Sequence, residues 1–459
     1  MTTWNSSGEW ERAIVIGGSI AGKLAARVLS DYFTEVFIIE RDSDSNNHPT
    51  VRNGVPQAAH GHALLKSGEE ILEKLFPGFI EELIASGAVA SDFSQDISWY
   101  HHGSWKIKHP SGIRTVQQSR PFLEHHLQRR LNRIENIKYI YGAQVKKLLT
   151  TSDQSKISGV VYHTKEEIVT KLGADLVVDA AGAASLTPKW LKASGLTAPD
   201  KTEVKIDLQY SSRIYQTLSP IESTWKGMLV YPNPPEQTLG GGIYQIEDGK
   251  WMVTLLGYGL DRSLANETSF LEHAANLDHK VIYDAIKDGV PVSDVSIYRF
   301  PNLRRFHYEK LNNLPNGLIV IGDAFCRIDP IFAQGMSLSA LEATALQDVL
   351  EQCKQNQSLN RISKKAHRRF SKILTIPWLI ALVEDFRFDH TTGKTFFGLS
   401  FMQSYIKKVV VACANDKDVY DSFIQVLHLK AHPVTLFSPR VLKSVWFQRR
   451  IAKGLELPS

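Results

Sequence analysis

The chain has few cysteines, no long apolar run and little net charge, and each shortage excludes a class of protein. Its 459 residues include only Cys326, Cys353 and Cys413, with no C-x-x-C pair. Such a set fits neither a disulfide framework nor a zinc site, and it suits a reducing compartment. No stretch reaches the roughly 18 consecutive apolar residues of a membrane-spanning helix. The N-terminal segment has no basic region followed by an apolar one, so it does not resemble a signal peptide. We therefore expect a cytoplasmic protein.

The charge of the chain is nearly balanced, with 53 Lys and Arg against 48 Asp and Glu and a formal net charge of +5. No dense basic tract is present, so nucleic acid is not an expected partner. Aromatic residues make up 10% of the chain and charged residues 22%, which argues against a disordered protein. At roughly 150 residues per domain, the length suggests about three structural units.

Residues 12–40 follow the strand–turn–helix–strand pattern of a dinucleotide-binding unit. Gly17 allows the tight turn and Gly22 allows the helix to pack closely, while Ser19 stands where the G-x-G-x-x-G pattern has its middle glycine. The start of such a helix offers free N–H groups and a positive dipole end to a pyrophosphate. Glu40 lies 18 residues after Gly22, close to the offset of a carboxylate that binds ribose hydroxyls. A carboxylate there favours FAD or NAD over NADP.

A second glycine-rich segment spans residues 317–337. Its apolar strand runs into Gly322-Asp323-Ala324, and Pro330 and Gln334-Gly335-Met336 then lead into a helix that the pattern predicts over 335–355. Further distinctive segments are 52–65, 119–131 and 174–185. With these segments the chain resembles FAD-dependent monooxygenases of the para-hydroxybenzoate-hydroxylase type. Within that group it is most similar to bacterial natural-product epoxidases and hydroxylases, such as the polyether polyene epoxidases.

The resemblance implies roles for individual residues. Asp323 would bind the ribityl hydroxyls of FAD, Arg120 would touch FAD, and the helix from Gly335 would face the flavin ring. The candidate cofactor-binding residues are Gly17, Ser19, Ile20, Ala21, Gly22, Glu40, Arg41, Arg120, Gly322, Asp323, Gly335 and Met336. The flavin-adjacent candidates for catalysis are Pro330, Gln334, Gly335 and His60, although His60 also fits a loop histidine with structural hydrogen bonds. No metal site is expected.

We expect an α/β (α+β) fold: a Rossmann-like FAD-binding domain, an inserted β-sheet substrate domain and a helical C-terminal region. The FAD-binding domain would be discontinuous, over 1–95, 117–200 and 300–358. The substrate domain would comprise 96–116 and 201–299, whose long aromatic strands suggest a large apolar ligand. Residues 359–459 would form the helical region.

The resemblance further implies a monooxygenase that inserts one oxygen atom of O₂ into a largely apolar natural product, by epoxidation or hydroxylation. Reduced flavin would form a C4a-(hydro)peroxide with O₂, and the hard chemistry would belong to the cofactor. Only one dinucleotide fingerprint is visible in the sequence, so electrons would come from transiently bound NAD(P)H or from a partner flavin reductase.

Three alternative functions share this architecture. They are a flavin-dependent halogenase, for which the chain has no G-W-x-W-x-I-P segment, a flavin-linked reductase of isoprenoid double bonds, and a non-catalytic escort protein for prenyl or lipid groups. The C-terminal segment 439–450 also combines Val441, Leu442, Val445 and Trp446 with Arg440, Lys443, Arg449 and Arg450. Such a basic amphipathic helix can contact an anionic membrane or pack its apolar stripe on the core.

Overall fold

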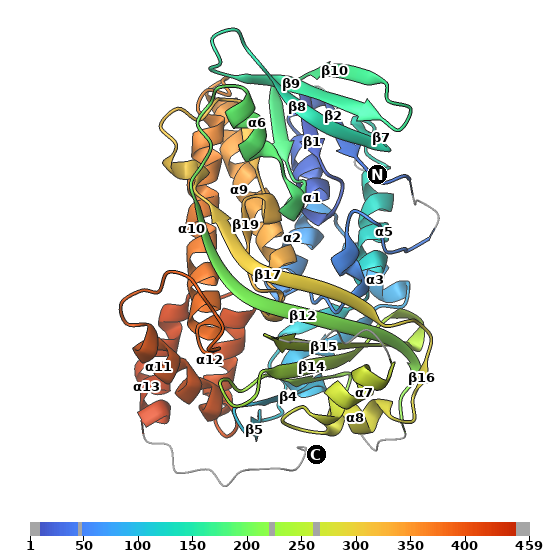
Figure 1. Ribbon diagram of the computed structural model, residues 1–459, viewed down its shortest axis with the longest axis vertical. Coiled ribbons are helices and arrows are strands. Elements are labelled where there is room, and N and C mark those ends of the chain that lie inside the picture. The colour runs from blue at the N-terminus through green and yellow to red at the C-terminus, as the bar shows by residue number, and fades with distance from the viewer. Residues whose placement is uncertain (1–9, 45–47, 220–224, 260–266, 447–459) are drawn as a thin grey trace.

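The computed structural model describes residues 10–44, 48–219, 225–259 and 267–446 (Figure 1). The strands are β1 (Trp10–Ile16), β2 (Phe33–Glu40), β3 (Val89–Asp92), β4 (Ile97–His101), β5 (Ser104–Trp105), β6 (Arg114–Gln117), β7 (Ile137–Tyr141), β8 (Ala143–Thr150), β9 (Ile157–Thr164), β10 (Val169–Gly173), β11 (Leu176–Asp179), β12 (Lys201–Thr217), β13 (Gly227–Val230), β14 (Leu239–Gln245), β15 (Trp251–Tyr258), β16 (Val290–Pro291), β17 (Ser296–Phe306), β18 (Leu318–Val320) and β19 (Cys326–Arg327). The α-helices are α1 (Ile20–Leu29), α2 (Lys66–Leu75), α3 (Phe79–Ala85), α4 (Phe93–Asp96), α5 (Arg120–Leu131), α6 (Thr187–Ala193), α7 (Glu267–Ala275), α8 (Val281–Ile286), α9 (Gly335–Gln355), α10 (Ile362–Asp385), α11 (Leu399–Ala412), α12 (Lys417–Leu427) and α13 (Pro439–Trp446).

A five-stranded parallel sheet positions the two glycine-rich turns. Its strand order is β18-β11-β1-β2-β7, and β11 and β18 are buried at every position, as expected for parallel strands covered on both faces. Ile16 pairs with Asp179, and Asp179 pairs with Val320. The strands therefore end side by side, and the turns that follow β1, β11 and β18 meet at one edge of the sheet. In such folds ligands bind at this edge.

A second, larger sheet of nine strands lies below the first in Figure 1. Its order is β19-β17-β12-β15-β14-β13-β4-β5, with β16 paired to β12. The 17-residue β12 and the 11-residue β17 pair along most of their length and curve across the molecule. The sheet takes its strands from residues 97–105, 201–258, 290–306 and 326–327, and the proposed domain limits stay a prediction. The predicted α/β fold with an inserted sheet is confirmed.

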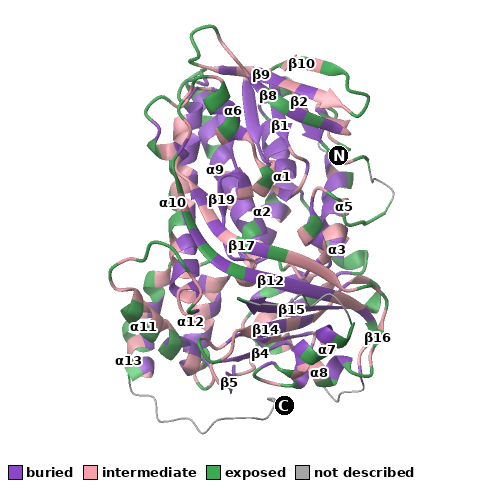
Figure 2. Cartoon of the chain, viewed as in Figure 1, coloured by how far each residue is buried: buried purple, intermediate pink, exposed green. Residues whose placement is uncertain are grey.

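Three clusters of buried apolar side chains in the described part of the chain stabilise these layers. Figure 2 shows the buried residues in purple. The largest consists mainly of buried residues of the parallel sheet and of helices α1, α2, α9 and α10. A second lies between the large sheet and helices α7 and α8. The third joins α11, α12 and α13 to Trp99 of β4, so the C-terminal helices are anchored to the sheet.

Helix α13 contributes its apolar face to this third core. Val441 and Val445 are buried there, whereas Trp446 is exposed. The stripe thus packs on the protein, as the second interpretation of segment 439–450 predicted; Arg449 and Arg450 lie outside the described residues. Within the described ranges, no helix combines the length and apolar character needed to cross a bilayer.

Candidate cofactor site

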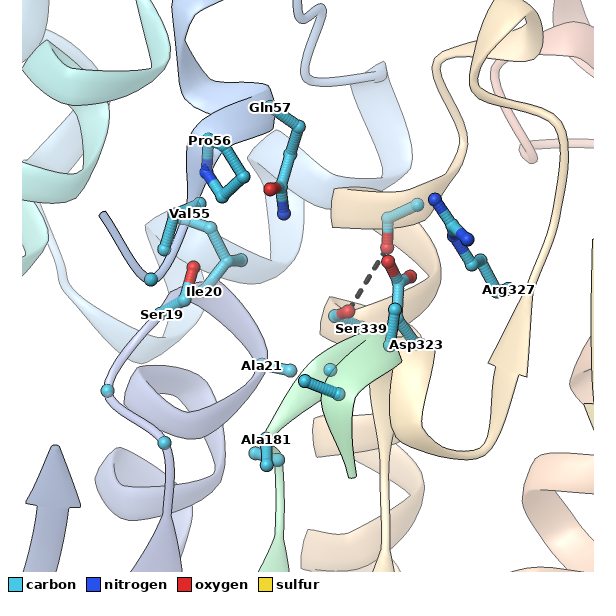
Figure 3. Close-up of a pocket in the computed structure, with 18 of the residues that line it drawn as sticks. Ser19, Ile20, Ala21, Val55, Pro56, Gln57, Ala181, Asp323, Arg327 and Ser339 are labelled. Atoms are coloured by element: carbon cyan, nitrogen blue, oxygen red, sulfur yellow. Dashed lines mark hydrogen bonds between the residues drawn. The ribbon is translucent and has the colours of Figure 1, made fainter. Parts of the chain in front are cut away.

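A cavity of about 410 Å³ opens where the parallel sheet meets the large sheet. This volume is in the range of ordinary ligand sites. Figure 3 shows part of its wall, with Ser19, Ile20 and Ala21 at the start of α1, Val55, Pro56 and Gln57 above them, and Asp323 and Arg327 opposite. Residues from seven separate stretches of chain line it, at 16–21, 39–41, 54–63, 143–145, 180–190, 298–300 and 323–339, with Arg120 and Tyr210.

The first turn of the cavity wall requires its glycines. Gly17 has φ +98°, and a Cβ on it would lie 2.6 Å from the Ala180 carbonyl oxygen. A Cβ on Gly22 would lie 1.9 Å from the Gly17 carbonyl oxygen. Neither contact is possible between real atoms, so the turn and the helix can approach only because both residues lack side chains. Gly22 itself does not line the cavity.

The start of α1 is left uncapped toward the cavity. Ser19 occupies the N-cap position but makes no side-chain cap hydrogen bond. Its hydroxyl donates to Glu124 Oε1 at 2.7 Å and accepts from Arg120 Nη2 at 3.0 Å. The Ser19 side chain therefore bonds to two residues of α5 and does not cap α1. The first N–H groups of α1 stay available to an anion.

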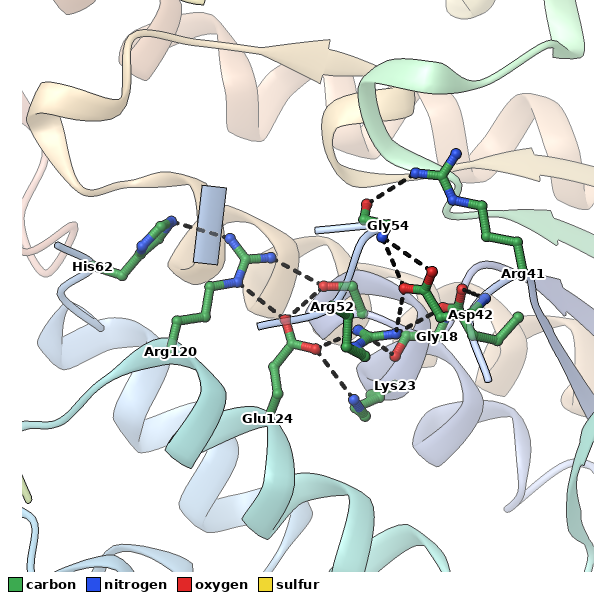
Figure 4. Close-up of polar contacts among 11 residues, drawn as sticks. Gly18, Lys23, Arg41, Asp42, Arg52, Gly54, His62, Arg120 and Glu124 are labelled. Atoms are coloured by element: carbon green, nitrogen blue, oxygen red, sulfur yellow. Dashed lines mark hydrogen bonds and ion pairs between the residues drawn. The ribbon is translucent and has the colours of Figure 1, made fainter. Parts of the chain in front are cut away.

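A buried charge network lies behind this turn (Figure 4). The Glu124 carboxylate forms ion pairs with Lys23 Nζ at 3.3 Å, Arg52 Nη2 at 2.5 Å and Arg120 Nε at 3.0 Å. Burial alone would raise its pKa, but these three cations hold the pKa of Glu124 well below its usual range. Burial lowers the pKa of Lys23 to about 8. The network fixes Arg120, a predicted cofactor residue, against the fingerprint turn.

Sequence reasoning missed Glu124, Arg52 and His62 as members of this site. Arg120 Nη1 lies 3.1 Å from His62 Nε2. Burial, followed by the charge of Arg120, lowers the pKa of His62 to about 3, so its ring is neutral at ordinary pH. The only sequence signal for Glu124 was its position four residues after Arg120, which places both on one helix face.

Glu40, the last residue of β2, and Arg41 after it also line the cavity. Glu40 accepts from the Gly18 N–H at 2.8 Å, the Asp42 N–H at 3.0 Å and Arg52 Nη1 at 3.0 Å. It therefore orients the turn as well as lining the cavity. Arg41 Nη2 donates to the Gly54 carbonyl at 3.2 Å, and its exposed side chain borders the same space.

The second glycine-rich turn brings Asp323 to the cavity. Gly322 has φ +65°, and a Cβ on it would lie 2.9 Å from Ala21 Cβ, so the two turns are in contact. Asp323 lines the cavity while Gly322 lies behind it. The Gly322 N–H donates to Glu342 Oε2 of α9 at 2.8 Å, and burial raises the pKa of Glu342 to about 8.

Replacing Glu342 with Gln should flatten part of the pH dependence of stability. Because the pKa of Glu342 is raised in the folded state, its contribution is fully present below pH 4.5 and is lost as pH rises through about 8. Gln keeps an acceptor for Gly322 and cannot ionise. Urea denaturation from pH 5 to 9 should show that the variant loses less stability than wild type as pH rises. An unchanged pH slope would contradict this.

The flavin-adjacent candidates divide into lining and supporting residues. Pro330, Gly335 and Met336 line the cavity. Gln334 is buried at the N-cap of α9 without lining the cavity, makes no side-chain cap, and its Oε1 has no hydrogen-bond partner. Like α1, helix α9 thus begins uncapped at the cavity.

His60 is buried in the cavity wall. Its Nδ1 lies 2.8 Å from Ser212 Oγ on β12, while its Nε2 has no hydrogen-bond partner within the described ranges of the chain. Burial lowers the pKa of His60 to about 4, so the ring is neutral at physiological pH. His60 therefore makes a structural hydrogen bond to β12 and also lines the cavity.

The three turns, the two uncapped helices and the large sheet over the cavity form one arrangement. It is the fold of FAD-binding flavoproteins. A solved flavoprotein/dehydrogenase from Cytophaga hutchinsonii superposes with a TM-score of 0.69 at 16% identity, over 94% of this chain and 96% of that one. The flavin-dependent brominase Bmp2 superposes with a TM-score of 0.67 at 15% identity, over 91% and 93%. The p-nitrophenol 4-monooxygenase PnpA from Pseudomonas putida DLL-E4 superposes with a TM-score of 0.65 at 15% identity, over 92% and 99%.

Sequence comparison gives two further matches. The family model described as GMC oxidoreductase matches residues 81–212, from α3 to β12. A protein of Mycobacterium tuberculosis (strain ATCC 25618 / H37Rv), named Protein Rv3254, is 29% identical over 400 residues, or 84% of this chain and 82% of that protein. The family-model match and the solved flavoproteins support a flavin-linked oxidoreductase, and the resemblance to the para-hydroxybenzoate-hydroxylase type stays a prediction.

Proposed function

We propose that the protein is an FAD-dependent monooxygenase. One observation carries the proposal: α1 and α9 both begin without a side-chain cap at one cavity, with Asp323 in the wall between them. Neither helix has an acidic residue in its first turn. Two positive helix ends at one cavity suit a ligand with two separated anionic or electron-rich parts, which fits the pyrophosphate and ring of FAD.

Different residues of the cavity would bind different parts of FAD. The N–H groups at the start of α1 would receive the pyrophosphate, and Asp323 would accept hydrogen bonds from the ribityl hydroxyls. The start of α9 at Gly335 and Met336 would face the flavin ring and stabilise negative charge on it. When bound, FAD supplies the activation of O₂.

The large sheet would hold the substrate over the ring. Tyr210, Tyr298 and Phe300 line the cavity on that side, and such aromatic walls exclude water and bury an apolar body. This supports a substrate that is largely apolar and of the natural-product type, which receives one oxygen atom by epoxidation or hydroxylation. Electrons would come from NAD(P)H or from a partner flavin reductase.

Replacing Asp323 with Ala should lower FAD retention by about tenfold or more, because a charge-assisted hydrogen bond would be lost. The ratio of flavin to protein absorbance after gel filtration measures this. Asp348→Ala removes an exposed carboxylate of α9, whose side chain pairs with Arg369, and should leave the ratio unchanged. Equal retention in both variants would contradict the assignment of Asp323.

Isotope-labelled O₂ tests the reaction. The protein with FAD, a reductant and candidate polyene or aromatic substrates should give a product that contains one labelled oxygen atom, seen by mass spectrometry. Hydrogenation without labelled oxygen would instead identify a double-bond reductase, and halide incorporation would identify a halogenase. A colourless protein that takes up no FAD would indicate an escort protein.

A further inference from the structure

A buried arginine in the cavity wall has no acidic partner. Arg327 of β19 is 8% exposed and lines the cavity. Its Nη2 donates to the Tyr298 hydroxyl at 2.9 Å, and its guanidinium carbon lies 3.9 Å from the centre of the Phe300 ring. Its Nε has no hydrogen-bond partner, and within the described residues no carboxylate oxygen lies within 4.0 Å of the guanidinium. A buried charge without an opposite charge is costly and calls for an explanation.

A second arginine increases the local excess of positive charge. Arg304 of β17 is the strand partner of Arg327. Arg304 donates to the Ala183 carbonyl at 3.0 Å, and in the described part of the chain it too has no ion pair. Burial lowers the pKa of Arg304, and the charge of Arg327 is the next cause of that shift, while the more weakly acting carboxylates of Glu203 and Asp323 oppose it. Like charges directly opposite on neighbouring strands destabilise a sheet, so an anion close to them would be favourable.

Other polar groups without partners lie at the same end of the cavity. The Tyr210 hydroxyl and His60 Nε2 are buried and have no hydrogen-bond partner among the residues that the structure describes. The His60 ring centre lies 6.1 Å from that of Tyr210 and 5.9 Å from that of Tyr298, which itself holds Arg327. Buried polar atoms without a partner in the described part of the chain therefore occur on three side chains of this aromatic part of the wall, Tyr210, His60 and Arg327.

We propose that this part of the cavity is a substrate subsite for an anionic oxygen, with Arg327 as the residue that binds it. The substrate class is a flat aromatic or conjugated acid, in which a carboxylate, phenolate or enolate pairs with Arg327 and the ring system packs against Phe300 and the neighbouring tyrosines. Arg327, Tyr298 and His60 thus determine specificity. This rests on the proposed function, because it names the substrate of the same site, and it adds an anionic group to the expected largely apolar substrate.

The cofactor's own anionic groups are the other source of negative charge, and the geometry favours the substrate. The uncapped start of α1, where a pyrophosphate would bind, lies on the opposite side of the cavity from Arg327 (Figure 3). Arg327 also belongs to the large sheet, together with Tyr210, Tyr298 and Phe300. A guanidinium stacked on a ring is well placed to receive a planar acid.

Paired acids and amides test the subsite without turnover. Benzoate, cinnamate and 2-naphthoate, each with its neutral amide, would be titrated into the purified full-length protein by calorimetry and by flavin absorbance. We expect the acids to bind about tenfold or more tightly than their amides, as charge-assisted hydrogen bonds require. Arg327→Met should abolish this preference, and Arg327→Lys should keep most of it.

Arg304→Met is the matched control, because Arg304 is a neighbouring half-buried cation that does not line the cavity. This variant should keep the preference for acids. The proposal is overturned if no acid binds better than its amide, or if Arg327→Met keeps the preference. It is also overturned if Arg327→Met lowers FAD retention while the preference for acids persists, since the anion would then be the cofactor. A protein that binds no FAD would contradict the proposed function. The binding of acids and amides could still be measured, because calorimetry does not depend on FAD.

Discussion

Replacing Glu124 with Gln is expected to lower the free energy of unfolding by about 3–5 kcal/mol, the cost of breaking a buried ion pair. Glu124 is the common partner of Lys23, Arg52 and Arg120 (Figure 4). Without its charge, three cations remain close together in a buried site. Among the described residues, Arg52 alone of the three keeps ion pairs, with Glu40 at 3.0 Å and with Asp42 at 3.8 Å. Urea denaturation at pH 7 measures the loss.

The pH dependence of this effect has a definite sign. The pKa of Glu124 is depressed in the folded state, so its stabilisation is present above its ordinary pKa of 4.5 and is lost as pH falls below that value. The difference between wild type and Glu124→Gln should therefore shrink in acid. Glu351→Gln is the control, because this carboxylate on α9 is exposed and accepts a hydrogen bond from the Tyr32 hydroxyl at 3.3 Å that Gln can also accept. This variant should change stability by less than about 0.5 kcal/mol. A loss under 1 kcal/mol for Glu124→Gln would refute the central role of this carboxylate.

Replacing Gly22 with Ala should both destabilise the protein and reduce FAD retention. The added Cβ would lie 1.9 Å from the Gly17 carbonyl oxygen, which is backbone and cannot rotate away. The helix or the turn must then shift, at a cost of about 3 kcal/mol, the upper part of the range for overpacking. Because the start of α1 is the expected phosphate site, the same shift should misplace its N–H groups. Thermal denaturation and the flavin-to-protein absorbance ratio report the two effects.

Gly335→Ala provides the matched comparison at the start of α9. A Cβ on Gly335 would meet no atom within 4 Å, and its backbone needs no positive φ. This variant should fold with a stability within about 1 kcal/mol of wild type, since alanine favours a helix. If both glycine variants have the same stability, the close approach at Gly22 does not carry the expected steric cost.

Local sequence patterns predicted the parts of the site that depend on neighbouring residues. The turn at 17–22 and the helix over 335–355 were both expected, and the latter occurs as α9 (Gly335–Gln355). Steric conditions at a tight turn and at a helix start act within a few residues, so they leave a readable pattern. The network around Glu124 left little signal, because Ser19 and Glu124 are 105 residues apart.

By itself, the sequence determined the α/β fold class and the two glycine-rich turns, since these follow from periodicity and turn chemistry. The assignment of Asp323 and Arg120 to one site came from the family resemblance, and both residues line the cavity. Only the tertiary structure decided which charges meet. It placed three cations around Glu124, bonded the Ser19 hydroxyl to Glu124, packed Val441 and Val445 of α13 into a core, and paired Arg327 with Arg304 on neighbouring strands. The physical reason is that electrostatic partnership depends on distances of a few ångströms between residues far apart in the chain, and strand pairing and helix packing set those distances.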